Sequence, residues 1–135
     1  MVSSIGVIIA THGSFSEILV ETTELILGRE SGLAPFTFSE GETPRESSRN
    51  LQTLIRKTDR GQGVIILVDL FGGTPGSLAL SLLEEEAVEV VTGVNLPMAI
   101  TAATLDPALD LASAAQQLVE GGRQGIRGAG LMLDS

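Results

Sequence analysis

The chain lacks cysteine altogether and has a single histidine, at position 12. The absence of cysteine excludes disulfides, thiolate chemistry and cysteine-based zinc sites. One histidine cannot build a multi-histidine metal centre unless subunits share ligands, so we expect no metal and no other cofactor. Tyrosine and tryptophan are absent too, and four phenylalanines are the only aromatic residues. The stacking platforms that bind single-stranded nucleic acids are therefore excluded.

Positive charge is scarce, with 8 lysines and arginines against 17 acidic residues and a net charge of −9. This balance argues against nucleic acid and anionic membranes as partners, and favours a basic protein partner. No apolar run reaches the ~18 residues of a membrane span. The opening residues, MVSSIGVIIATHGS, lack the basic region of a signal peptide. We therefore expect a cytoplasmic protein.

Apolar residues, by contrast, are plentiful: they make up 43% of the chain, and the mean hydropathy is +0.32. The length of 135 residues predicts one domain, residues 1–135, with a sizeable core. Apolar, β-branched runs predict strands at 5–10, 33–39, 63–70 and 88–93. Helical patterns separate them, so we expect a three-layer α/β/α fold with a doubly wound, mostly parallel sheet of order 2-1-3-4.

Caps and glycines predict where the helices begin and end. The first helix follows a cap at Ser14 or Ser16 and ends at Gly28. Its apolar positions at helical spacing are Phe15, Ile18, Leu19, Leu25 and Ile26. The other helices are expected from the capping box Thr43–Glu46, from Thr74 to about Glu86, at 97–104, and from Asp110 to near the glycines at 121 and 122. The tail QGIRGAGLMLDS, residues 124–135, is a candidate fifth strand or a loose end.

Two polar side chains stand where neighbouring strands of this sheet end. His12 follows the first strand and Asp69 ends the third. Ligands of such sheets bind at the carboxyl ends of the strands, at the switch point of the topology. We therefore expect His12 and Asp69 to meet at one edge, each beside a helix N-terminus.

The stretch VDLFGGTPGS, residues 68–77, supplies the other parts of a phosphate site. A helix N-terminus offers unpaired N–H groups and partial positive charge, which bind anions. Gly72 and Gly73 let the backbone approach an anion, and the Thr74 hydroxyl adds a donor. An imidazole beside this site can attack phosphorus, and an aspartate on one ring nitrogen would leave the other free to do so.

Three blocks of the sequence resemble the mannose-family enzyme IIA domain of the bacterial phosphotransferase system: GVIIATHGSFSEILVETTELILG, VIILVDLFGGTPGSLAL and VEVVTGVNLPM. The resemblance implies that His12 is phosphorylated, that Asp69 is its partner, and that Thr74 helps hold the phosphoryl group. We place the residues Gly13, Phe71, Gly72, Gly73 and Thr74 in the phosphate site. One departure is Ser77, where the family often has asparagine.

The resemblance also implies partners. HPr would donate the phosphoryl group, and enzyme IIB, whose acceptor in this sugar family is a histidine, would receive it. The membrane permease would be an indirect partner only. No IIB domain follows before Ser135, so IIB is expected to be a separate protein. A homodimer is implied as well, with an antiparallel fifth strand, here 125–133, exchanged between subunits.

Other functions remain open at this point. The phosphorylation state of His12 would serve equally well in a regulatory sensor of carbon supply. The phosphoryl donor subunit of dihydroxyacetone kinase has a similar fold and histidine, although the DLFGGTP and GVNLP segments fit it less well. A Ser–His–Asp hydrolase would use Ser14 or Ser77, neither of which stands in a G-x-S-x-G elbow. A plain binding module would make His12 dispensable.

Overall fold

The computed structural model describes residues 4–70, 77, 81–84 and 87–133. Its sheet consists of four parallel strands in the order β2-β1-β3-β4, so the predicted fold class and strand order are confirmed. The strands are β1 (Gly6–His12), β2 (Ala34–Phe38), β3 (Val64–Val68) and β4 (Val88–Thr92). The helices are α1 (Phe15–Leu27), α2 (Pro44–Thr58), the 3-10 turn η1 (Leu82–Glu84), α4 (Leu96–Ala103), α5 (Leu111–Gln124) and α6 (Ala129–Leu133).

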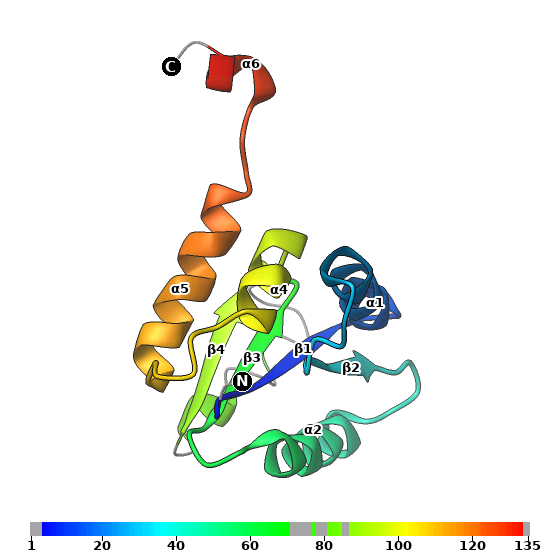
Figure 1. The fold of residues 1–135 in the computed structure, drawn as a ribbon. Coiled ribbons are helices and arrows are strands. Elements are labelled where there is room, and N and C mark those ends of the chain that lie inside the picture. Colours follow the sequence, from blue (N-terminus) through cyan, green and yellow to red (C-terminus); the bar gives the residue numbers. More distant parts are fainter. Residues whose placement is uncertain (1–3, 71–76, 78–80, 85–86, 134–135) are drawn as a thin grey trace.

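Helices cover both faces of the sheet, as Figure 1 shows with α2 on the side opposite α1 and α4. All five residues of β3 are buried, because a central parallel strand is covered on both faces. Leu67 of β3 belongs to the core shared with α1, α4 and α5, whereas Val68 belongs to the core on the α2 side. The capping box of α2 forms as predicted, with Thr43 Oγ1 accepting a hydrogen bond from the Glu46 N–H at 3.1 Å.

The apolar positions predicted for α1 are mostly exposed. Leu19 is buried, but the exposed fractions are 43% for Phe15, 53% for Ile18, 82% for Leu25 and 55% for Ile26. The buried face of α1 consists instead of Ser16, Leu19, Val20 and Thr23. Hydrogen bonds explain why polar residues occupy this face. The N–H and hydroxyl of Ser16 and the hydroxyl of Thr23 all have partners, so burying these residues against the sheet costs little free energy.

The last long helix, predicted to end near Gly121 and Gly122, continues through both glycines to Gln124. Both glycines lie where α5 crosses α4. A Cβ on Gly121 would collide with the Thr101 hydroxyl, and one on Gly122 would lie 2.8 Å from Met98 Cε. These glycines therefore serve close helix packing and not helix termination.

The tail does not form a strand within this chain. Residues 129–133 form the short helix α6, which stands away from the body of the molecule in Figure 1. Its apolar side chains are exposed, at 76% for Leu131, 51% for Met132 and 87% for Leu133. A strand exchanged in a dimer stays a prediction, because it would need a second copy.

Candidate functional site

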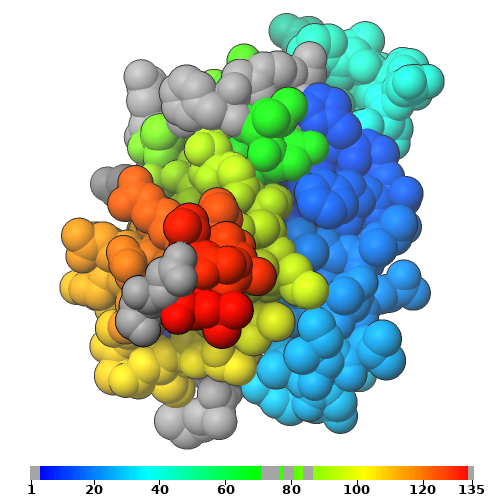
Figure 2. Space-filling model, turned by 90° about the horizontal axis from the view of Figure 1, so that it is seen from above, coloured from blue at the N-terminus to red at the C-terminus, as the bar shows by residue number. Residues whose placement is uncertain are grey.

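The ends of β1 and β3 bring the two predicted catalytic residues together. The strands are direct neighbours, with Ala10 opposite Val68, so His12 and Asp69 emerge at the same edge of the sheet. In Figure 2, the surface at the end of β3 (green) lies directly beside that at the end of β1 (blue). The predicted proximity of these two side chains is confirmed.

One carboxylate oxygen holds both the ring and the main chain of His12. Asp69 Oδ2 lies 2.8 Å from Nδ1 of the ring and 3.2 Å from the backbone nitrogen of His12. The second oxygen, Oδ1, accepts a hydrogen bond from the Leu70 N–H at 3.1 Å. The Asp69 side chain is 15% exposed, whereas that of His12 is 53% exposed. The ring is therefore held by Asp69 at its Nδ1 side, while about half of the side chain is exposed to solvent.

The pKa of Asp69 lies below its ordinary value. Partial burial alone would raise this pKa, but the hydrogen bonds from the ring and backbone of His12 favour the carboxylate and outweigh burial. An ionised carboxylate only accepts hydrogen bonds, so Nδ1 must carry the hydrogen. In the neutral ring, Nε2 is then left with a free electron pair, which is the form that a nucleophile needs.

A hydrogen bond to the Thr11 side chain stabilises the turn that carries His12. The Thr11 hydroxyl, fully buried, accepts a hydrogen bond from the Ser16 N–H at 2.7 Å. The Ser16 hydroxyl in turn donates to the carbonyl of Phe36 on β2 at 3.0 Å. The predicted cap at Ser14 or Ser16 is thus corrected: Ser14 is at the N-cap position but makes no side-chain cap bond. Thr11 satisfies an N–H of the first turn in its place.

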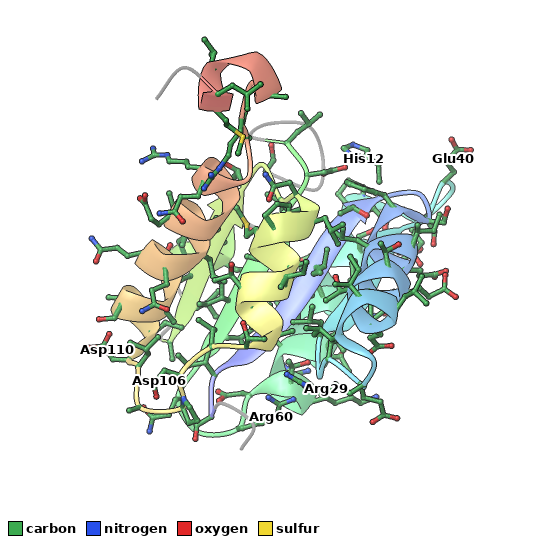
Figure 3. All side chains as sticks on the ribbon, turned by 45° about the horizontal axis from the view of Figure 1, so that its top comes forward. His12, Arg29, Glu40, Arg60, Asp106 and Asp110 are labelled. Carbon is green, nitrogen blue, oxygen red and sulfur yellow. The ribbon has the colours of Figure 1, made fainter. Side chains whose placement is uncertain are left out.

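A shallow cavity of about 470 Å³ opens beside the ring. Its walls come from the β1–α1 turn and the end of β2, and its lining residues are His12, Gly13, Ser14, Glu17, Thr37, Phe38, Ser39 and Glu40. Gly13 has φ +55°, which favours glycine in this turn. Figure 3 shows His12 and Glu40 at this end of the molecule. The carboxylates of Glu17 and Glu40 make this rim acidic.

The other predicted phosphate-site residues, Phe71, Gly72, Gly73 and Thr74, lie outside the described residues, as does most of the helix predicted from Thr74 to Glu86. Of that helix, Ser77 is helical and Leu82–Glu84 form η1. No group of three or more candidate metal ligands occurs in the described part of the chain.

Sequence reasoning missed two features of this site. The first is Thr11, whose signal was its position as a hydroxyl residue in an otherwise apolar strand, five residues before Ser16. The second is the exposed apolar pair Phe15 and Ile18, which lies on the first turn of α1 directly after the histidine turn. Their helical spacing looked like a core stripe, and only the phase of α1 shows that they face solvent.

Within the described ranges, no helix has the length and apolar character required to cross a membrane.

Comparison with known proteins gives one consistent family. The family described as "PTS system fructose IIA component" matches residues 6–119. The chain is 34% identical over 128 residues to the PTS system mannose-specific EIIAB component of Escherichia coli K12, covering 92% of this chain and 39% of that protein. The chain thus spans about two fifths of the length of this curated relative.

Two further relatives agree. Identity to the PTS system fructose-specific EIIA component of Bacillus subtilis 168 is 33% over 102 residues, covering 75% of this chain and 70% of that protein. Among solved structures, the mannose/sorbose specific IIA subunit of the phosphotransferase system from Enterococcus faecalis superposes with a TM-score of 0.82 at 25% identity, covering 95% of each chain.

Proposed function

The chain belongs to the mannose- and fructose-type enzyme IIA family of the sugar phosphotransferase system, and from this premise we propose that His12 accepts a phosphoryl group from phospho-HPr and passes it to an enzyme IIB. The observation that supports this proposal most strongly is the 2.8 Å contact between His12 Nδ1 and Asp69 Oδ2. It orients the ring and leaves Nε2 exposed. The dihydroxyacetone kinase alternative is not favoured, because the relatives are sugar phosphotransferase components.

In the proposed reaction, the electron pair on Nε2 attacks the phosphorus of the donor phosphohistidine. The new bond joins phosphorus to Nε2, while the bond to the donor nitrogen breaks and its electron pair returns to the donor ring. His12 then carries positive charge shared over its ring, and the Asp69 carboxylate, with its lowered pKa, stabilises that charge through Nδ1–H. In the transfer to IIB, His12 is the donor: the acceptor histidine attacks the phosphorus, and the bond from phosphorus to Nε2 of His12 breaks.

The negative charge on the phosphoryl oxygens must be stabilised by hydrogen-bond donors. Neither lysine nor arginine is among the residues that line the cavity beside His12. We therefore assign stabilisation to backbone N–H groups at Gly13 and, by the family resemblance, at Phe71, Gly72 and Gly73, with the Thr74 hydroxyl. In this proposal, neither a metal nor another cofactor is required.

The surface around the His12 cavity suits a partner protein whose contact surface is basic with an apolar centre. Phe15 and Ile18, at the start of α1, are exposed, and Glu17 of the same turn lines the cavity beside His12. Glu40 adds negative charge from the β2–α2 loop, and the whole chain carries −9. Such a surface attracts a cationic partner before contact and then buries apolar area. We accordingly propose that HPr and IIB dock over this rim in turn, in the cytoplasm.

The proposed homodimer has support at the other side of the sheet. β4 is an edge strand of the described sheet, and a groove of about 910 Å³ follows it, lined by residues of β4 and α5 such as Val90 and Gln116. An unpaired strand edge beside a groove can accept a further strand. The exposed apolar tail is the segment of this chain that fits, so we propose that the tail of a second copy fills the groove.

The proposed function is tested by incubating the protein with phosphoenolpyruvate, enzyme I and HPr and measuring acid-labile phosphate. The wild type is expected to be labelled, and His12→Ala is expected to take up no label while remaining folded, because the His12 side chain is 53% exposed and belongs to neither core cluster. Thr53→Ala, on α2 and outside the lining of this cavity, is the control, and it should be labelled normally. Full labelling of His12→Ala would overturn the proposal.

A further inference from the structure

A second cavity lies at the opposite end of the sheet from His12. Its volume is about 680 Å³, within the range of about 300–1,000 Å³ typical of small-molecule sites. It is formed by the first residues of β1, the α1–β2 loop, the α2–β3 loop and the end of α4. Figure 3 shows Arg29 and Arg60 at this end, far from His12. The proposed phosphoryl transfer does not involve this cavity.

One part of the cavity lining is apolar and buried, and we call it the floor. It is made by buried side chains from β1, the start of β2 and the end of α4, which are Ile5, Val7, Leu33, Ala102 and Leu105, all at most 8% exposed. Such a floor can cover the carbon skeleton of a ligand, but it offers no polar partner. Any charged part of a ligand must therefore lie at the rim.

Two guanidinium groups stand at that rim, although they are 31 positions apart in the sequence. Arg29 donates to the carbonyls of Glu30 at 3.1 Å and Ala103 at 3.4 Å, and Arg60 donates to the carbonyl of Gly32 at 3.4 Å. These bonds to the walls hold both side chains at the cavity mouth. Each guanidinium has five N–H donors in a planar fork, a geometry that matches phosphate and carboxylate oxygens.

The loop that carries Arg29 is held in one shape. Gly28 and Gly32 have φ values of +71° and +76°, which place the turn on either side of Ser31. The N–H and the hydroxyl of Ser31 both donate to Glu24 Oε2 at 2.9 Å. The carboxylate of Glu24 is thereby occupied within the loop. A rigid rim of this kind lowers the ordering cost of binding.

The local charge differs in sign from that of the whole molecule. Of the charged residues that line the cavity, Arg29 and Arg60 are cationic and Glu30 is the one carboxylate. The chain as a whole carries 8 basic against 17 acidic residues. Two of its few cations thus converge on one cavity. The clustering favours an anion there, although the chain as a whole is negatively charged.

We propose that this cavity binds a compact organic anion, with its phosphate or carboxylate group between Arg29 and Arg60 and its carbon skeleton on the apolar floor. The site is independent of His12 and does not depend on the phosphoryl transfer proposed above. Phosphate and carboxylate share the required chemistry, two or more oxygens that accept from guanidinium groups, and the test separates them.

The test is a titration of the ¹⁵N-labelled full chain, followed by amide chemical shifts. The probes are butyl phosphate and butyrate, with butanol as the neutral analogue and sodium chloride as the control for ionic strength. Saturable shifts at Ser31, Gly32 and Ala103, absent with butanol and with salt, are expected. The stronger of the two probes identifies the head group. No saturable shifts with either anion, or shifts centred on His12, would overturn the proposal.

Variants separate the arginines from general charge effects. Arg29→Gln and Arg60→Gln should each weaken binding by about tenfold, the scale for a charge-assisted contact. Arg49→Gln makes the same change of charge on α2, outside the cavity lining, and should bind as the wild type does. Amide spectra of each variant show whether the fold is intact. Equal affinity in all three variants would contradict the assignment of the head group to the arginines.

Discussion

Asp69 Oδ2 lies 2.8 Å from Nδ1 of His12 and 3.2 Å from the backbone nitrogen of His12. A single carboxylate oxygen, directly after β3, therefore orients both the ring and the main chain at the end of β1. This relationship links the topology to the chemistry. Adjacent parallel strands bring the two residues together. The Asp69 side chain is 15% exposed and that of His12 is 53% exposed, so the imidazole is the group that a partner protein can reach.

Asp69→Asn should slow phosphorylation of His12 by roughly 100-fold, the scale for losing one preorganised electrostatic contact. The amide keeps the shape but loses the charge, and its NH₂ group can donate to Nδ1 and so favour the wrong tautomer. The rate of label uptake from phospho-HPr measures this effect. Asp59→Asn, in the α2–β3 loop, is the control for charge. An unchanged rate in Asp69→Asn would remove the carboxylate from the mechanism.

The stabilising contribution of the Asp69 carboxylate should depend on pH. Its pKa is lowered in the folded chain, so the contribution is complete above the ordinary value of about 4 and is lost as the pH falls through the folded pKa. The difference in melting temperature between wild type and Asp69→Asn should therefore be constant near neutrality and shrink below about pH 4. A difference that persists undiminished at lower pH would show that the carboxylate charge is not its source.

Thr11→Val should lower the free energy of unfolding by about 1–3 kcal/mol, because it removes the acceptor of the buried Ser16 N–H while keeping the side-chain shape. Chemical denaturation measures the change. Thr53→Val is a matched control, since its hydroxyl donates to a carbonyl of the same helix on a partly exposed face of α2. Equal costs for the two variants would mean that the Thr11–Ser16 bond does not fix the histidine turn.

Removal of the tail after Gly125 should convert a dimer into a monomer without unfolding the domain, because the described residues of the tail are exposed and outside both core clusters. Light scattering after gel filtration measures the mass, and circular dichroism checks the fold. Replacing Leu131 and Leu133 with aspartate should have the same effect. A full-length chain that is monomeric at all concentrations would contradict the exchanged strand.

The parts of the fold that depend on local chemistry could be predicted from the sequence. The β-branched runs and the capping box at Thr43–Glu46 located strands and α2, and the order 2-1-3-4 expected for a doubly wound sheet is the one observed. That order alone placed His12 next to Asp69. Neither prediction required knowledge of distant contacts beyond the rules of parallel sheets.

The errors arose where tertiary contacts override local pattern. The phase of α1 is set by hydrogen bonds from Ser16 to Thr11 and Phe36, so four of its predicted core residues are exposed, namely Phe15, Ile18, Leu25 and Ile26. Gly121 read as a stop signal, although the crossing of α5 over α4 requires it. The exchanged strand at 125–133 is not one of these errors and stays a prediction: a strand needs a partner, and within one chain residues 129–133 form α6.

The most direct test of the central claim is the identity of the phosphorylated nitrogen. The protein, with ¹⁵N-labelled histidine, is phosphorylated by phosphoenolpyruvate, enzyme I and HPr, and the ring is observed by ¹⁵N and ³¹P NMR. Because Asp69 holds Nδ1–H at 2.8 Å, we predict that the phosphorus is bonded to Nε2 of His12 and that Nδ1 keeps its hydrogen. Phosphorus bonded to Nδ1, or to any other residue, would contradict the role assigned to the His12–Asp69 pair.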